Sequence, residues 1–219
     1  ATLAAINIQT LKRLFHGTQN VAPEIAHVMA LAYAPIIRSF LLPCAAYYAY
    51  VTWGHWQDEV GLQRLTLAGL SVSTIIYCLA ARHWLKVVEK VSFGGLELIG
   101  LLANLLIFAN VALYMQLSFV EEKLIYFILI SIVFSTSGIT FRSGLFSVGL
   151  AIGTMLWFAA GVSAGTLAQY ISIGVAASVV AIGMSYLLRK AMKRQVRARM
   201  DADQLAVEAT FQANTDMLT

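Results

Sequence analysis

Five long stretches without a charged residue constrain the fold of this 219-residue chain more than any other feature. The first four contain 19, 17, 23 and 18 residues and the fifth contains 46; they are residues 39–57, 65–81, 98–120, 124–141 and 143–188. An α-helix needs about 20 apolar residues, within a range of about 17 to 25, to cross the hydrocarbon core of a bilayer. Each of the first four stretches fits one such helix, and the fifth fits two helices joined by a turn at 161–169. We therefore predict an all-α integral membrane protein, a bundle of six transmembrane helices at residues 37–56, 63–82, 96–117, 123–141, 143–161 and 168–188.

Composition and the placement of the cations agree with this prediction. Only 12% of the residues are charged, about half the share in a soluble domain. Lys and Arg next to membrane spans favour the cytoplasmic side. With the N-terminus inside, thirteen of the 15 lie on that side, and only Arg64 and Lys123 lie outside. We therefore place both termini in the cytoplasm. The net charge of +4 then reflects this topology and contact with anionic lipid headgroups, and we expect no nucleic-acid partner.

The segment before the first span, residues 1–35, has no secretory signal pattern. Apolar residues recur at helical spacing in both of its halves, and Pro23 suits a helix N-terminus, where its missing N–H is not needed. We expect one or two amphipathic helices on the inner membrane surface. The alternative is a tail without fixed structure.

A candidate ligand site is suggested by aromatic residues in the outer half of the first span. Such clusters are typical of the aromatic belt at a membrane interface, and they also suit one wall of a pocket for a lipophilic ligand. In the third span, Asn104 and Asn110 can either bond neighbouring helices or contact a ligand. The candidate ligand-binding residues are Tyr47, Tyr48, Trp53, His55, Asn104, Asn110 and Trp157.

Cys44 and Cys78 lie inside predicted spans, where they suit the role of small apolar residues, and no disulfide is expected. The spacing of the four histidines does not favour a metal or haem site. We assign no metal, no cofactor and no catalytic residue within these 219 residues. A carboxylate ladder or an inverted repeat, which mark many transporters, is not evident.

After the sixth span the chain becomes basic and stays helical in pattern. Apolar residues continue at three- and four-residue steps, as in a coiled coil. We predict a signalling helix over residues 189–213 that forms a parallel homodimer together with span six. The alternative is a juxtamembrane helix held by lipid charge. The residues expected to transmit a signal are Leu188, Met192, Val196, Met200 and Val207.

The last seven residues, ANTDMLT (213–219), resemble the segment that leads into GGDEF domains, the catalytic modules of diguanylate cyclases. In that family a signalling helix ends in A-x-x-D-x-L-T followed by G-L-x-N-R. Ala213, Asp216, Leu218 and Thr219 match, and residues 214–219 would be the stub of such a domain. The resemblance implies a bacterial inner-membrane protein whose missing domain condenses two GTP into cyclic di-GMP with Mg²⁺. Residues 36–188 would be its six-helix sensor.

The sensor also resembles the six-helix receptors of quorum-sensing histidine kinases, which bind small hydrophobic α-hydroxyketones. The resemblance rests on Pro43, Tyr47, Tyr48, Trp53 and the E-x-G-L segment at 59–62. We therefore expect the sensor to respond to a hydrophobic ligand, a lipid or a membrane state, and to regulate the cyclase by rearranging the dimer. A histidine kinase or adenylyl cyclase output, or a small transporter or channel, are the alternatives.

Overall fold

The computed structural model describes residues 23–88 and 91–216, and this part of the chain is helical, without a strand. It contains six α-helices and one short 3-10 helix: α2 (Pro23–Asp58), α3 (Gly61–Val87), α4 (Phe93–Leu117), η1 (Glu121–Leu124), α5 (Ile125–Ser137), α6 (Phe141–Ala160) and α7 (Ala164–Asp216). Five helices in the described residues are long and apolar enough to cross a membrane, namely α2 from Val28, α3, α4, α6 and α7 up to Ala209. The coarse prediction of an apolar helical bundle is confirmed.

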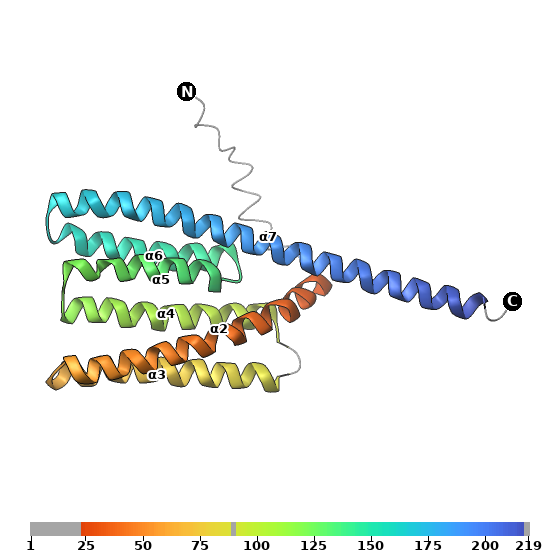
Figure 1. Ribbon diagram of the computed structural model, residues 1–219, viewed down its shortest axis with the longest axis horizontal. Helices are drawn as coiled ribbons and strands as arrows, with labels where there is room; N and C mark the ends of the chain where they lie inside the picture. The colour runs from red at the N-terminus through yellow and green to blue at the C-terminus, as the bar shows by residue number, and fades with distance from the viewer. Residues whose placement is uncertain (1–22, 89–90, 217–219) are drawn as a thin grey trace, which may run out of the picture.

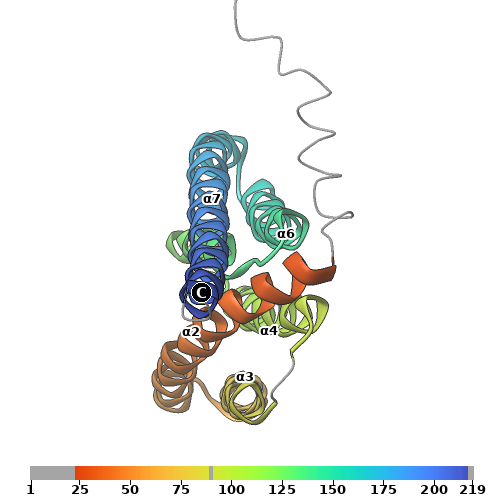
Figure 2. The ribbon, with the colours of Figure 1, turned by 90° about the vertical axis from the view of Figure 1, so that its right-hand side faces the viewer.

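The helices run back and forth between two ends of the bundle (Figure 1). Helices α2 and α3 form a tightly packed hairpin, α5, α6 and α7 pack together on the other side, and α4 lies between the two groups. Helix α7 extends well beyond the bundle at one end, which we name the α7 end; the opposite end is the far end (Figure 1). The start of α2 lies at the α7 end, beside α7 (Figures 1 and 2).

Capping side chains and one glycine turn define the ends of several helices. The Ser92 side chain accepts a hydrogen bond from the Gly95 N–H (3.0 Å) at the start of α4. Thr140 does the same for the Ser143 N–H (3.1 Å) at the start of α6. Both are N-caps, which satisfy N–H groups that have no partner inside the helix. At the far end, Gly61 takes a φ of +58° between α2 and α3, a backbone conformation that glycine adopts without strain.

The fourth predicted span differs most from the structure. In place of a helix over 123–141, η1 is followed by α5, which has 13 residues and spans about 20 Å at 1.5 Å per residue. Gly138 then leaves the helix with extended backbone angles. The preceding residues Ser131, Ser135 and Thr136 turn their hydroxyls onto backbone carbonyls three residues earlier, a bond that competes with regular helix geometry.

The first helix also differs from the predicted boundary at residue 35. Residues 23–35 continue into the first apolar span as one helix, although Pro35 and Pro43 lie inside it. Residues 1–22, the rest of the predicted amphipathic segment, lie outside the described residues.

Two apolar clusters form the core. The cluster at the α7 end joins α2, α3, α4 and α7 and includes Tyr33, Ile37, Cys78, Leu96, Met192 and Val196. The other lies towards the far end and joins Tyr48 of α2 to residues of α4, α5, α6 and α7 around Phe127, Phe134 and Met155, which are all 0% exposed. The outer surface is nevertheless apolar, because large side chains such as Ile76 (62% exposed) and Val179 (67% exposed) point outward. That distribution is compatible with a surface that faces lipid, since lipid tails are as apolar as these side chains.

Candidate functional site

The seven predicted ligand-binding residues fall into an outward-facing group and an inward-facing group. Tyr47, Trp53 and Trp157 are 59%, 60% and 67% exposed and lie on the outer surface of α2 and α6. Tyr48 is buried and its hydroxyl donates to the Ile107 carbonyl of α4 at 3.4 Å. His55 is half-buried beside the Tyr114 ring, with 5.6 Å between ring centroids. The binding of a ligand by these residues stays a prediction.

Asn104 of α4 is 1% exposed and connects three helices. Its Nδ2 donates to Ser147 Oγ of α6 at 3.3 Å, and its Oδ1 accepts from Ser137 Oγ of α5 at 2.8 Å. A buried amide that lacked these partners would lose the free energy of its hydration without compensation. Asn104 therefore holds α4 against α5 and α6.

Asn110, six residues further along α4, connects to α3 instead. Its Oδ1 accepts from Ser71 Oγ at 2.8 Å, and its Nδ2 donates to Thr74 Oγ1 and to its own helix at the Leu106 carbonyl, both at 2.9 Å. Six residues turn an α-helix by about 600°, which places Asn110 a third of a turn away from Asn104. The interhelical role predicted for both asparagines is confirmed.

Helix α4 is thus bonded to every long neighbour in the bundle. Besides the two asparagines, its backbone carbonyls at Ile99 and Ile107 accept from Tyr77 of α3 at 2.8 Å and Tyr48 of α2 at 3.4 Å. A shift of α4 along its axis would strain bonds to α2, α3, α5 and α6 together. The polar contacts make α4 the element through which the two helix groups are coupled.

At the α7 end, Arg189 ties α7 to the connection between α5 and α6. Its Nη2 donates to the carbonyls of Gly138 (2.9 Å) and Thr140 (2.5 Å), and its guanidinium carbon lies 5.6 Å from the centre of the Phe141 ring. The Thr140 hydroxyl in turn donates to the Glu97 carboxylate of α4. Arg189 Nε and Nη1 are buried without a hydrogen-bond partner in the described part of the chain. Arg189 therefore makes fewer hydrogen bonds than its five N–H groups allow.

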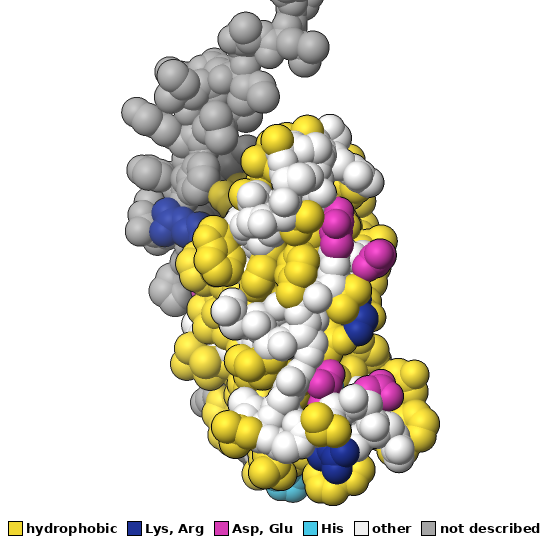
Figure 3. All heavy atoms as spheres, turned by 90° about the vertical axis from the view of Figure 1, so that its left-hand side faces the viewer, with side chains coloured by type: hydrophobic (Ala, Val, Ile, Leu, Met, Phe, Trp, Pro, Cys, Tyr) yellow, Lys and Arg dark blue, Asp and Glu magenta, His cyan; other side chains and the backbone are white. Residues whose placement is uncertain are grey.

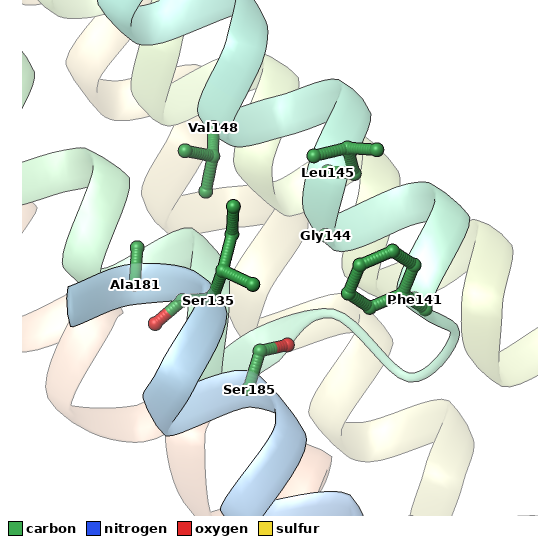
Figure 4. A pocket seen from close by; sticks show the side chains of 8 residues that line it. Ser135, Phe141, Gly144, Leu145, Val148, Ala181 and Ser185 are labelled. Atoms are coloured by element: carbon green, nitrogen blue, oxygen red, sulfur yellow. The ribbon is translucent and has the colours of Figure 1, made fainter. Parts of the chain in front are cut away.

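A small cavity lies next to this contact, between α5, α6 and α7 (Figure 4). Its volume of about 10 Å³ is roughly the room that one water molecule needs. The serine hydroxyls give it a polar side and the remaining side chains are apolar; it is lined by Ser135, Phe141, Gly144, Leu145, Val148, Ala181, Ile182 and Ser185.

The far end carries a separate group of charges, seen in Figure 3 as acidic and basic side chains on an otherwise apolar and uncharged face. Glu121 Oε1 accepts from Thr166 Oγ1 of α7 at 3.0 Å, and its carbonyl accepts from Tyr170 at 3.2 Å. Lys123 donates a hydrogen bond to the Tyr114 hydroxyl of α4. These contacts fix η1 to α4 and to the start of α7.

The predicted transmission residues do not share one environment. Met192 and Val196 are 8% and 5% exposed and belong to the apolar cluster that contains the start of α2. Met200 packs against the same cluster. Leu188 is 36% exposed and Val207 is 70% exposed, so the stripe is covered at Met192 and Val196 and exposed at Leu188 before them and at Val207 beyond them.

The segment that resembles the approach to a GGDEF domain is described only in part. Asp216 is the last residue of α7, its side chain is not described, and Leu218 and Thr219 lie outside the described residues. In the described part of the chain, no group of three or more His, Cys, Asp or Glu side chains could hold a metal ion. Cys44 and Cys78 are free thiols.

Sequence reasoning missed the partners of the polar residues. An asparagine of α4 is hydrogen-bonded to each of four hydroxyls, those of Ser71, Thr74, Ser137 and Ser147. Hydroxyl side chains are common in uncharged stretches, and the sequence does not indicate which group each one bonds. Arg189 is the first charged residue after 46 uncharged residues. That position, one residue beyond a predicted span, was a usable signal for a contact at the end of the bundle.

No family model matches the chain, and no curated protein or solved structure matches it either. The class of this protein therefore follows from its helices: it is a helical bundle in which five helices have the length and composition of membrane spans.

Proposed function

We propose that this chain is the membrane sensor and transmission helix of a diguanylate cyclase whose GGDEF domain follows Thr219. The observation that carries the proposal is the continuity of α7, which runs for 53 residues from an apolar span, through a basic segment, to Asp216. A continuous helix transmits rotation or displacement from the bundle to whatever is attached at its end. The resemblance of the A-x-x-D-x-L-T segment at 213–219 to the entry of GGDEF domains supports a GGDEF domain as the attached domain.

The bundle crosses the bacterial inner membrane six times in this proposal, with both termini in the cytoplasm. The distribution of Lys and Arg supports this orientation. The start of α2 and the projecting part of α7 lie at the same end (Figure 1), as six crossings require. Helix α5 with η1 covers roughly 28 Å, from 13 residues at 1.5 Å and four at 2.0 Å, close to the thickness of about 30 Å that a span must cover.

The signal reaches the bundle from the lipid. Tyr47, Trp53 and Trp157 are the predicted ligand contacts that face outward, and they are placed to meet a hydrophobic molecule dissolved in the membrane or a change in the membrane itself. Asn104 and Asn110 then relay the change rather than bind the ligand, because their side chains already bond neighbouring helices. The response is limited by the ligand's differential affinity for the two states.

The output requires a homodimer, in which α7 of each copy brings one GTP-bearing domain to the other. GTP and Mg²⁺ would be held by the GGDEF domain and not by the residues described above. Val207, on the part of α7 beyond the bundle, is free of the bundle's core and 70% exposed, which suits contact with a second copy.

The test begins with the coding sequence beyond Thr219. We expect Gly-Leu-x-Asn-Arg followed by a GGDEF-type loop. The full-length protein in membrane vesicles with GTP and Mg²⁺ should then produce cyclic di-GMP, and Trp157→Ala should change the response to membrane composition while insertion is retained. A stop codon or an unrelated domain after Thr219 would show that the chain is not part of a diguanylate cyclase. An unchanged response to membrane composition in both Trp157→Ala and Tyr47→Ala would show that the lipid-facing residues do not form the sensing site.

A further inference from the structure

One face of α7 is covered where it leaves the bundle and uncovered beyond it. Met192 and Val196 are 8% and 5% exposed, whereas Val207 is 70% exposed. Val196 and Val207 are eleven residues apart, close to three full helical turns, so they lie on the same face. A second copy of α7 that pairs through Val207 would extend its contact along this face to Met192, if the face were free.

The covering residues come from α2. Met29, Ala30 and Tyr33 are 8%, 1% and 5% exposed and belong to the same apolar cluster as Met192 and Val196. We name residues 28–34 the α2 arm. Figure 2 shows α2 starting to one side of α7 and running toward it, and the two helices are in contact. The arm therefore occupies the part of α7 nearest to the bundle.

Two features make the arm separable from α7. Pro35 follows it directly, inside α2, and proline has no N–H to bond the carbonyl four residues earlier, so a helix bends at such a point at little loss. The contact of α2 with α7 is also much less extensive than its contact with α3. The arm can tilt away while the rest of α2 stays in its hairpin.

A second copy of α7 would also bind the face around Met192 and Val196 only weakly. Five exposed cations surround it with no acidic residue among them, and in two paired helices they would repel each other; they are Lys190, Lys193, Arg194, Arg197 and Arg199. The limited contact of α2 with α7 weakens the hold of the arm, and the repulsion between cations weakens the pairing of two copies at this face.

We propose that the α2 arm and a second copy of α7 compete for the face of α7 around Met192 and Val196. With the arm in place, two copies pair only beyond the bundle, around Val207. With the arm released, the paired region extends toward the membrane and the two output domains are held in a different relative position. The inference rests on the proposed function in taking a dimer of α7 as the output.

The experiment compares disulfide formation between copies at two positions of the chain in native membranes. Val207→Cys reports the uncovered region and Val196→Cys the covered region, and the chain with only Cys44 and Cys78 gives the background. We expect cross-linking at position 207 to be faster than at position 196. Ala30→Leu adds volume at a closely packed site and should raise the rate at 196 about fivefold, with the rate at 207 unchanged.

Two further variants keep the proposal falsifiable. Leu31→Ala is the matched control, because Leu31 is 53% exposed on the other face of the same turn, and it should leave both rates unchanged. Pro35→Ala restores an N–H that can bond the Leu31 carbonyl, which stiffens the helix at this point, and it should therefore lower the rate at 196. This variant tests the arm even if Ala30→Leu fails to fold. The proposed competition is wrong if Val196→Cys and Val207→Cys cross-link at equal rates without a substitution in the arm. It is also wrong if neither Ala30→Leu nor Pro35→Ala changes the rate at 196. Either result would still support a dimer of α7. If neither Val196→Cys nor Val207→Cys cross-links, α7 does not form a dimer, and both the proposed function and the proposed competition are wrong.

Discussion

At the scale of single residues, the bundle depends on a few buried polar side chains that its apolar interior makes costly to leave without a hydrogen bond. Asn104 and Asn110 each satisfy both ends of their amide with partners on other helices. Their depth in an apolar span allowed the prediction that they join helices. Their partners could not be predicted, because a hydroxyl in a span can bond its own backbone as easily as another helix, as Thr66 and Ser73 do here.

Ser71→Ala should destabilise the bundle by removing the donor to Asn110 Oδ1. The expected loss is about 0.6 to 1.7 kcal/mol, the range for hydrogen bonds between membrane helices. Ser73→Ala is the control, because Ser73 is exposed on the same helix and bonds only the Gly69 carbonyl of its own turn. Thermal unfolding in detergent, followed by circular dichroism, measures both; equal midpoints for the two variants would show that the Ser71–Asn110 bond contributes nothing.

Arg189→Gln should loosen the connection between α5 and α6. The variant loses the hydrogen bonds to the Gly138 and Thr140 carbonyls, and the first turn of α6 should open more often. Amide hydrogen exchange over residues 138–145 should therefore become faster. Arg194→Gln, which changes an exposed cation on the same helix, should leave exchange in that segment as it is, and protection retained in Arg189→Gln would contradict a structural role for this arginine.

At the scale of helices, hydropathy predicted which segments are helical but not how each one ends or what it packs against. Helices α3, α4 and α6 lie within a few residues of their predicted spans. Helix α5 is shorter because Gly138 and the hydroxyls before it end the helix early. The α2 arm was expected on the membrane surface, since an apolar stripe fits a lipid surface and a neighbouring helix equally well.

Gly138→Ala should be among the most disruptive small substitutions in the chain. A Cβ at position 138 would lie 2.8 Å from Gly144 Cα and 2.9 Å from Gly144 N, and backbone atoms cannot move aside as a flexible side chain can. We expect a loss of about 1 to 3 kcal/mol from this overpacking. Gly153→Ala is the control, since nothing lies within 4 Å of its added Cβ; it should be neutral or slightly stabilising. Thermal unfolding in detergent compares them, and equal stability of the two variants would mean that the α5–α6 connection yields more easily than its geometry implies.

At the scale of the whole molecule, the sequence predicted an apolar helical bundle, while the arrangement of α2 with α3 and of α5, α6 and α7 on either side of α4 emerged only from packing. The two groups meet α4 through different residues, Asn110 towards α3 and Asn104 towards α5 and α6. The α2 arm also packs with Met192 and Val196 of α7 in one apolar cluster. A displacement of one group against the other would therefore disturb both the hydrogen bonds of α4 and the contact between the arm and α7.

The number of membrane crossings depends on whether η1 and α5 cross, and Val162 is the position that decides it. Cysteines at Val60, Phe119 and Val162 would lie in the three connections at the far end, and all three side chains are exposed, at 74%, 44% and 41%. With six crossings, a membrane-impermeant maleimide should label all three from outside intact cells. Leu205→Cys, on the projecting part of α7 and 66% exposed, should label only after the cells are permeabilised. If α5 does not cross, Leu205→Cys should be labelled from outside intact cells and Val162→Cys only after permeabilisation. Val60→Cys and Phe119→Cys should still be labelled from outside. That result would place the end of α7 outside the cytoplasm and would be incompatible with a domain that uses GTP.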